Sequence, residues 1–191
     1  MAEILLVRHA ETEWSVARRH TGRTDIPLTE GGRAAARGLA PLAERPLALV
    51  LISPLSRAAE TAALAGLRGE TDPDLVEWDY GAYEGRRTVD IRDELPDWSL
   101  WRDGAPEGET AEHVGERVDR LLADLRSGSG DAIVFSHGHL LRVLTARWLG
   151  LAPTEGRLFA LDPGSLSVLG HERETPVVRL WNAGRLIERP G

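Results

Sequence analysis

The sequence predicts an α/β protein, a three-layer αβα sandwich around a mostly parallel sheet with an antiparallel strand at one edge. Three observations support this class. Short apolar runs, each closed by polar or turn residues, alternate with segments whose apolar residues recur at helical spacing. Strands that are apolar on both faces are typical of parallel sheets covered by helices on both sides. Near the carboxyl end, two strand-like runs are separated only by a polar turn, which favours an antiparallel edge.

Five runs are expected to form strands. The three buried parallel strands are Ile4 to Val7, Leu47 to Ile52 and Ala132 to Phe135. The two at the carboxyl end are Ser165 to Leu169 and Pro176 to Trp181, joined by a polar turn around Glu172 to Glu174.

Three helices are expected between these strands. Thr29 can cap a helix that runs through Ala43 and ends at the Arg45–Pro46 pair. Thr110 can cap a second helix, whose apolar stripe stops at the glycine and serine turn Ser127 to Gly130. The third helix is expected over Leu140 to Trp148.

Length and composition exclude several classes. The 191 residues suit one domain, predicted to span 1–191. A net charge of −7 disfavours binding to nucleic acid or to an anionic membrane, since both need a basic face. With no cysteine, disulfides and thiol nucleophiles are excluded. The sequence shows neither a signal-peptide pattern nor an apolar run near the ~20 residues that span a bilayer, so a cytoplasmic location is expected.

The first buried strand ends in an Arg–His pair, Arg8 and His9. Open α/β sheets bind ligands beyond the carboxyl ends of their strands, so His9 is expected to face such a crevice. The neighbouring cation disfavours protonation, and a neutral imidazole suits attack on a phosphoryl group. A histidine that only caps a loop carries similar weight from this segment alone.

The second strand runs into SPLSRAAET, Ser53 to Thr61. Pro54 ends the strand, and Ser56 is expected to cap the next helix. Arg57 then falls in the first helical turn, where the helix dipole is already positive. A bound phosphate would explain this arginine, and a solvated surface arginine is the alternative.

The third strand ends in AIVFSHGHLLR, Ala132 to Arg142, where His137 holds the position that His9 has in the first strand. Gly138 would let the backbone approach a ligand closely. His137 and His139 could instead bind a metal, but no nearby carboxylate completes a ligand set. No metal or other cofactor is therefore expected.

The loop EWDYGAYEG, Glu77 to Gly85, offers two candidate proton donors, Glu77 and Glu84. Phosphoryl transfer to an imidazole needs a proton for the departing alkoxide. Spacing alone does not choose between the two, and an acidic solvated loop is the alternative. Since the three predicted parallel strands all end in basic or imidazole residues, their carboxyl ends would share one crevice, which fits metal-free transfer through a phosphohistidine.

From Leu5 to about Arg142 the chain resembles the histidine phosphatase superfamily, which includes the phosphoglycerate mutases. Four motifs carry the resemblance: RHAETEW, SPLSRAAET, EWDYGAYEG and FSHGH. It implies His9 as nucleophile, Glu77 as proton donor, and a phosphate pocket of Arg8, Arg57 and His137.

The chain departs from the family pattern at two positions. Ala10 stands where the family usually has glycine, which tests whether this turn needs a positive φ. Ser15 stands where asparagine is frequent, and its hydroxyl can still donate one hydrogen bond to a phosphate oxygen. Activity is expected to survive both changes.

Three further segments, RRHTGRTDIPLT, WSLWRDGAPEGET and HGHLLR, are similar to the branch of sedoheptulose-1,7-bisphosphatase-like enzymes and broad-range acid phosphatases. By this similarity, Arg102 would reach a second phosphate or sugar hydroxyls, and a plain surface charge is the alternative. The substrate contacts expected are Ser15, Thr21, Gly22, Ser53, Tyr80, Arg102 and Gly138.

The expected function is therefore a metal-independent phosphatase of small phosphorylated metabolites, with sugar phosphates or bisphosphates favoured. One alternative is a phosphoglycerate mutase, which must keep water from the phosphohistidine; the segment Arg86 to Glu109 leaves little chain for such a lid. The other is a noncatalytic protein that binds a phosphorylated ligand. The expected partner is a phosphorylated small molecule, with a homodimer as one option for the assembly.

Overall fold

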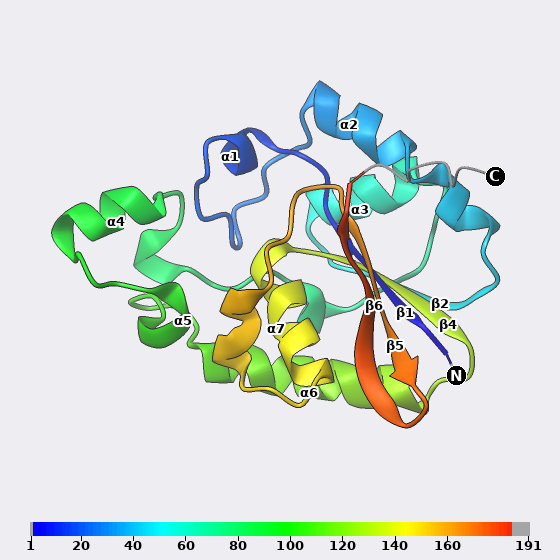
Figure 1. Ribbon diagram of the computed structural model, residues 1–191. Helices are drawn as coiled ribbons and strands as arrows, with labels where there is room; N and C mark the ends of the chain where they lie inside the picture. Colours follow the sequence, from blue (N-terminus) through cyan, green and yellow to red (C-terminus); the bar gives the residue numbers. More distant parts are fainter. Residues whose placement is uncertain (1, 185–191) are drawn as a thin grey trace.

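A six-stranded sheet between two layers of helices forms the centre of the molecule (Figure 1). The structure is a computed structural model that describes residues 2–184. The strand order is β3-β2-β4-β1-β5-β6. β1 to β4 pair in parallel, whereas β5 is antiparallel to β1 and β6 is antiparallel to β5. The predicted αβα class is confirmed, and its antiparallel edge is a hairpin.

All five predicted strands are present. Within residues 2–184, the one strand that the sequence did not indicate is β3, which has just two exposed polar residues. The strands are β1 (Ile4–Arg8), β2 (Leu47–Ile52), β3 (Glu70–Thr71), β4 (Asp131–Ser136), β5 (Leu166–Glu172) and β6 (Thr175–Ala183).

The two faces of the sheet are buried by different helices, as side-chain alternation along β1 shows. Ile4 and Leu6 pack into the core formed with α6 (Ala111–Ser127) and α7 (Gly138–Trp148). Leu5 and Val7 point the other way, into the core that includes residues of η1 (Ala40–Glu44) and α3 (Ser56–Leu64). β1 therefore buries both faces, which explains its continuous apolar run.

Helix termini follow the predicted caps with one correction. The hydroxyls of Thr29 and Thr110 accept from backbone N–H groups at the start of α2 (Glu30–Arg37) and of α6. The expected helix through Ala43 is wrong, because α2 stops at Arg37 with Gly38 as its C-cap. A separate 3₁₀ helix, η1, follows and has proline in its first turn.

Short elements lie beyond the carboxyl ends of the parallel strands. In Figure 1 the α4–α5 segment projects to one side of the sheet.

None of the helices in the described residues is long and apolar enough to cross a membrane. The remaining elements are α1 (Glu13–Val16), η2 (Pro73–Leu75), η3 (Gly81–Tyr83), α4 (Thr88–Glu94), α5 (Leu100–Asp103) and η4 (Pro153–Leu158).

Helix α3 is capped by a residue far away in the sequence. Ser56 is the first residue of the helix and makes no side-chain cap, so the predicted cap is wrong. Instead the Asp25 carboxylate accepts from the Ser56 N–H at 3.0 and 3.1 Å and from its hydroxyl at 2.9 Å. Asp25 thereby satisfies a free amide of the first turn, next to Arg57.

This cap predicts that Asp25→Ala lowers the free energy of unfolding by about 1 kcal/mol, the usual cost of losing a side-chain N-cap. Ser56→Ala removes the exposed hydroxyl and its hydrogen bond to Asp25 but keeps the Ser56 N–H, so it should cost a few tenths of a kcal/mol. Asp25→Asn keeps an acceptor oxygen and should lie between them. Urea denaturation of the three variants measures the order, and a larger loss in Ser56→Ala than in Asp25→Ala would contradict it.

Candidate active site

Two histidines meet where β1 and β4 end. His9 and His137 each follow the last residue of their strand, and the His9 N–H donates to the Ser136 carbonyl at 2.8 Å. Their ring centroids are 5.2 Å apart. Arg57 joins them from α3, because its Nε donates to His137 Nδ1 at 3.2 Å. The structure thus brings together the residues that follow the three predicted buried strands.

The protonation of His9 is fixed by its surroundings. Its Nδ1 lies 2.8 Å from the Ala10 carbonyl, and since a carbonyl can only accept, Nδ1 carries the proton. The lone pair of the neutral ring is therefore on Nε2. Burial lowers the pKa of His9 well below its usual value, and the charges of Arg8 and Arg57 add to this effect. His9 is a neutral imidazole with a basic Nε2 at neutral pH.

Arg57 is a fully buried cation held by backbone carbonyls. Its Nη2 donates to Thr21 and Gly22 at 3.0 and 2.8 Å, and its Nη1 donates to Thr24 at 3.0 Å. A side chain on Gly22 would come within 2.7 Å of the Trp78 carbonyl, so only glycine fits there. Two predicted substrate contacts, Thr21 and Gly22, thus support Arg57 through their carbonyls.

Arg8 lies across the amino-terminal end of α7. Its Nη1 donates to the Leu161 carbonyl, while its buried Nε has no hydrogen-bond partner within residues 2–184. A side chain on Gly138 would come within 3.2 Å of Arg8 Cζ, so this glycine makes room for the guanidinium. An unpartnered charged donor at a helix N-terminus is suited to an anion.

His137 is oriented by two side chains. Its Nδ1 accepts from Arg57, so Nε2 carries the proton and donates to Ser53 Oγ at 2.7 Å. Burial lowers the pKa of His137 well below its usual value, and the charge of Arg57 lowers it further. Ser53 is itself fully buried and lies behind His137.

The two acidic candidates have different surroundings. Both oxygens of Glu77 accept backbone N–H groups, from Trp78 at 2.9 Å, Leu140 at 2.9 Å and His139 at 3.0 Å, and Glu77 lines the pocket described below. Glu84 instead accepts from the N–H groups of Gly22 and Thr24. The geometry therefore presents Glu77, and not Glu84, to a ligand.

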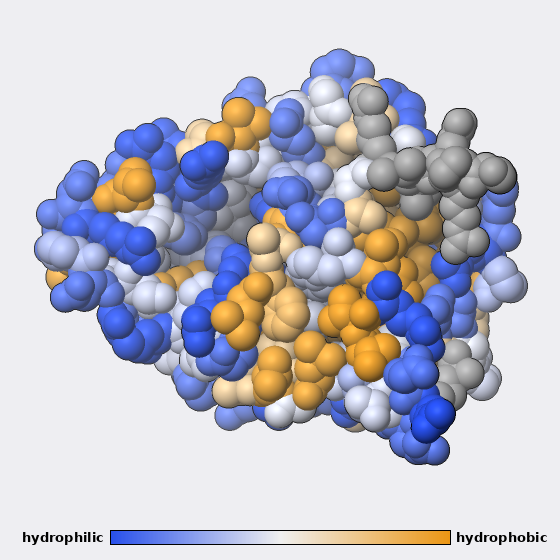
Figure 2. Space-filling view, in the orientation of Figure 1, coloured by the Kyte–Doolittle hydropathy of each residue, from blue (hydrophilic) through white to orange (hydrophobic). Residues whose placement is uncertain are grey.

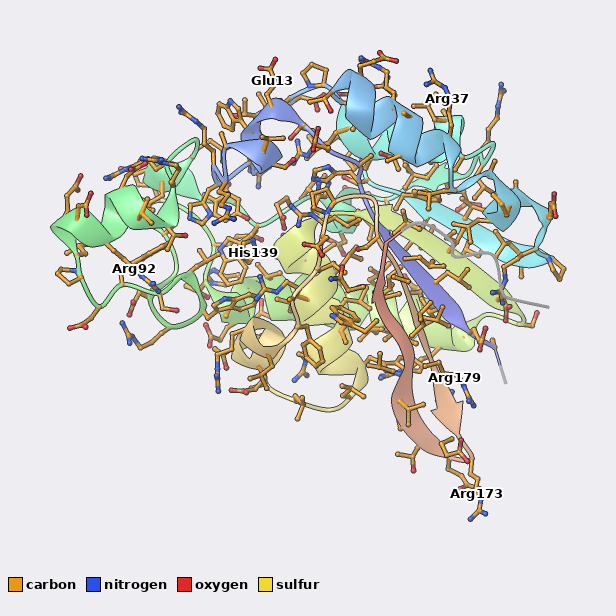
Figure 3. The ribbon with its side chains drawn as sticks, turned by 45° about the horizontal axis from the view of Figure 1, so that its top comes forward. Glu13, Arg37, Arg92, His139, Arg173 and Arg179 are labelled. Atoms are coloured by element: carbon orange, nitrogen blue, oxygen red, sulfur yellow. The ribbon has the colours of Figure 1, made fainter. Side chains whose placement is uncertain are left out.

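Arg8, His9 and Glu77 line a pocket of about 320 Å³. Arg57, His137 and Ser53 are fully buried and do not line it. Figure 3 shows His139 at the start of α7, on the side toward α4 and α5. Some lining residues were not predicted, although RRHTG and HGHLLR contain most of them: Arg18, Arg19, His20, Thr88, His139, Arg142 and Leu161 to Pro163. The predicted residues that line it are Arg8, His9, Ser15, Thr21, Glu77, Tyr80 and Gly138.

Comparison with known proteins agrees with this geometry. The family model "Histidine phosphatase superfamily (branch 1)" matches residues 4–184. The chain belongs to this superfamily. An acid phosphatase of Mycobacterium tuberculosis is 42% identical over 175 residues, which cover 88% of this chain and 86% of the relative. Sedoheptulose 1,7-bisphosphatase of Saccharomyces cerevisiae is 35% identical over 222 residues, covering 97% and 81%.

Other similarities extend the comparison. An Enterobacter protein named a probable phosphoglycerate mutase is 35% identical, with coverage of 100% of this chain and 93% of the relative. A solved structure of an open reading frame from Mycobacterium tuberculosis superposes with a TM-score of 0.91 at 39% identity, covering 96% of this chain and 98% of that one. As a histidine phosphatase with such relatives, the chain is a phosphoric monoester hydrolase that acts on phosphorylated small molecules.

The two departures from the histidine phosphatase pattern have structural explanations. Ala10 is not among the non-glycine residues with positive φ in the described chain, so this turn does not require glycine. Its methyl group packs with Leu28 and Ala36. The Ser15 hydroxyl donates to the Thr12 carbonyl at 2.8 Å within the capping box of α1, so it is already engaged at the pocket wall.

Arg102 is not brought to the pocket of this histidine phosphatase. Its guanidinium is largely exposed on α5 and pairs with Asp103 at 2.8 Å and with the Asp97 carbonyl. The arginines that do line the pocket beyond Arg8 are Arg18, Arg19 and Arg142. The structure therefore places Arg102 outside the lining of this pocket, and the similarity carried no information on how the α4–α5 segment folds.

A cluster of neutral rings forms one pocket wall. Tyr80 OH lies 2.7 Å from His139 Nδ1, and burial raises the pKa of Tyr80 well above its usual value. The hydroxyl therefore donates, and the proton of neutral His139 lies on Nε2. The His20 ring packs 4.6 Å from Tyr80, and burial lowers the pKa of His20 to about 4.

This burial predicts a pH dependence of stability. Between pH 6.5 and about 4 the unfolded chain protonates His20 while the folded chain does not, so folding loses stability as the pH falls. The loss at pH 5.5 relative to pH 7.5 is about 1.4 kcal/mol from this one residue. His20→Gln should shrink the difference in unfolding free energy between these pH values by that amount.

Urea denaturation at both pH values checks this. His113→Gln is the matched control, because His113 is exposed, and it should leave the difference unchanged. Equal pH dependence in the wild type and in His20→Gln would contradict the assignment.

Proposed function

We propose that this histidine phosphatase hydrolyses small phosphorylated metabolites, foremost sugar phosphates or bisphosphates, through a phosphohistidine on His9. The observation that carries the proposal is the fixed tautomer of His9 near two guanidinium groups, the fully buried Arg57 and the half-buried Arg8. A basic Nε2 that stays neutral can attack phosphorus, and the arginines neutralise charge on the phosphoryl oxygens. In this proposal the arginines, and not a metal ion, neutralise the charge of the phosphoryl oxygens.

The reaction has two balanced steps. First, His9 Nε2 forms a bond to phosphorus as the bond to the ester oxygen breaks, and Glu77 gives its proton to the leaving oxygen. Second, water attacks the phosphohistidine, Glu77 takes the proton of that water, and the bond from phosphorus to Nε2 breaks. His9 is then neutral again and inorganic phosphate leaves. The position of Glu77 on the pocket wall supports this role.

The choice of substrates has two supports. The relatives named acid phosphatase and sedoheptulose 1,7-bisphosphatase act on phosphate esters by name. The pocket wall of hydroxyl, imidazole and guanidinium groups offers hydrogen bonds to a hydroxylated leaving group. The mutase-named relative keeps phosphoglycerate mutase as the second candidate.

The nucleophile is tested by His9→Ala, which should lower kcat on the order of 10³-fold or more because no other group takes the phosphoryl group. Rapid alkaline quenching of the wild type during turnover, followed by peptide mass spectrometry, should show an adduct on His9. Circular dichroism controls for folding. A folded variant that retains turnover, or an adduct elsewhere, would overturn the proposal. Scoring 3-phosphoglycerate for isomerised product against free phosphate separates mutase from phosphatase.

The role of Glu77 as proton donor is tested by comparing substrates whose leaving groups differ in their need for a proton. Glu77→Gln should lower kcat/KM about 10²-fold or more for an alkyl phosphate, whose alkoxide needs a proton. The loss should be much smaller for p-nitrophenyl phosphate, whose phenolate leaves unprotonated.

Glu84→Gln makes the same change in charge at the other glutamate of the loop and is the control. Its effect should not depend on the leaving group, because Glu84 holds the backbone of Gly22 and Thr24. Equal losses for both esters in Glu77→Gln would remove Glu77 from the proton transfer.

A further inference from the structure

The pocket is larger than the reacting phosphoryl group requires. Its volume of about 320 Å³ corresponds to roughly ten water molecules at their liquid volume. Beyond the phosphate site it extends to the end of α1, where Arg18 and Arg19 line it. This region therefore offers space for a part of the substrate that does not react.

Arg18 and Arg19 differ from most arginines of the chain in lacking a counter-ion. Across the described residues most arginines lie within 4.0 Å of a carboxylate, as in the pairs formed by Arg23, Arg33 and Arg120. In the same part of the chain neither Arg18 nor Arg19 has such a partner, and Arg19 donates only to the Gly85 carbonyl, at 3.2 Å. Two positive charges thus line the pocket without a carboxylate within 4.0 Å of either, although Glu77 and Asp162 line other parts of it.

The backbone of Arg18 is the second observation. The Arg18 N–H donates to the Ser15 carbonyl and the Arg19 N–H to the Trp14 carbonyl, a Schellman motif that ends α1. The position that Arg18 fills needs the left-handed conformation, which Arg18 adopts with φ 54°, and glycine is the residue that adopts it without strain. Attraction to the dipole of a four-residue helix is a weak reason to place an arginine there.

Resting on the proposed function, we infer that Arg18 and Arg19 form a second anion subsite. It holds an anionic group of the substrate other than the reacting phosphate, either a second phosphate or a carboxylate. The guanidinium groups supply paired N–H donors suited to either group. Arg18 and Arg19 then select substrates with two anionic groups over simple monoesters.

The test compares kcat/KM for three substrates in the wild type and in Arg18→Gly: fructose 1,6-bisphosphate, 3-phosphoglycerate and p-nitrophenyl phosphate. The expected result is a fall of about tenfold in the ratio of the bisphosphate to the aryl phosphate, chiefly through KM. Arg18→Lys, which keeps the charge, should recover part of the ratio. Since glycine suits the backbone, the melting temperature of Arg18→Gly should not fall below that of the wild type.

Arg173→Gly is the matched control. Arg173 also has φ 54° but lies at the tip of the β5–β6 hairpin, far from His139 in Figure 3. The same relief of backbone strain there should leave the substrate ratios unchanged.

The outcomes are distinct from those that test His9. A fall confined to 3-phosphoglycerate identifies the second group as a carboxylate and supports the subsite. If the ratio of kcat/KM to that of the aryl phosphate is unchanged for both fructose 1,6-bisphosphate and 3-phosphoglycerate, the subsite is overturned. An equal fall for all three also overturns it, because Arg18 would then act on the reacting phosphate or on the fold, while hydrolysis through His9 would stand.

Discussion

The burial of Arg57 is the constraint on which the rest of the site depends. A guanidinium with no exposure to solvent keeps its charge only if its N–H groups are satisfied, and here neutral acceptors satisfy most of them. Its charge is thus only partly cancelled, by Asp25 at 3.8 Å. The remaining field acts on both active-site imidazoles and disfavours their protonation. Because Nε of Arg57 donates to His137, protonating that ring nitrogen would also place two donors against each other.

The hydrogen bonds that hold Arg57 also explain the position of Glu84, the second glutamate of the acidic loop. To hold Arg57, the carbonyls of Thr21, Gly22 and Thr24 must point inward. In an irregular segment the N–H groups then need acceptors of their own, and the Glu84 carboxylate accepts from two of them. Glu77 plays the corresponding part at the start of α7, where free amides are inherent to a helix end. Both glutamates thus satisfy backbone, but only Glu77 does so at the pocket.

How far the sequence predicts such a site depends on the range of the interactions. The apolar runs and the Thr29 and Thr110 caps are local signals, and they predicted the strands and two helix starts. The convergence of His9, Arg57 and His137 followed from strand ends sharing one edge of a sheet. The Asp25 cap joins residues 31 apart, which no local pattern encodes.

Arg18 and Arg102 show that the sequence alone does not indicate which arginines lie at the pocket. Both are exposed arginines, Arg18 just after α1 and Arg102 within α5, so residue type and exposure do not separate them. What separates them is their place in the fold: Arg102 pairs with its neighbour Asp103 away from the pocket, while Arg18, which is itself in the left-handed conformation, lines it. A motif in the sequence indicated His9 through its place at a strand end. Loops vary more than strands do, so residues that contact a ligand from a loop are harder to indicate from a motif.

The net charge of the protein and the arginines of the pocket act on an anionic substrate in opposite directions. A protein of net charge −7 repels an anionic substrate at long range, but salt at physiological strength screens charges beyond about 8 Å. Within that distance the pocket presents Arg8, Arg18, Arg19 and Arg142 against Glu77 and Asp162. In Figure 2 apolar side chains gather instead over the region of η4 and the β5–β6 hairpin, and the α4 side is mostly hydrophilic. The local excess of positive charge therefore outweighs the acidic surface where the substrate enters, since outlying carboxylates are screened and many are paired with arginines of their own.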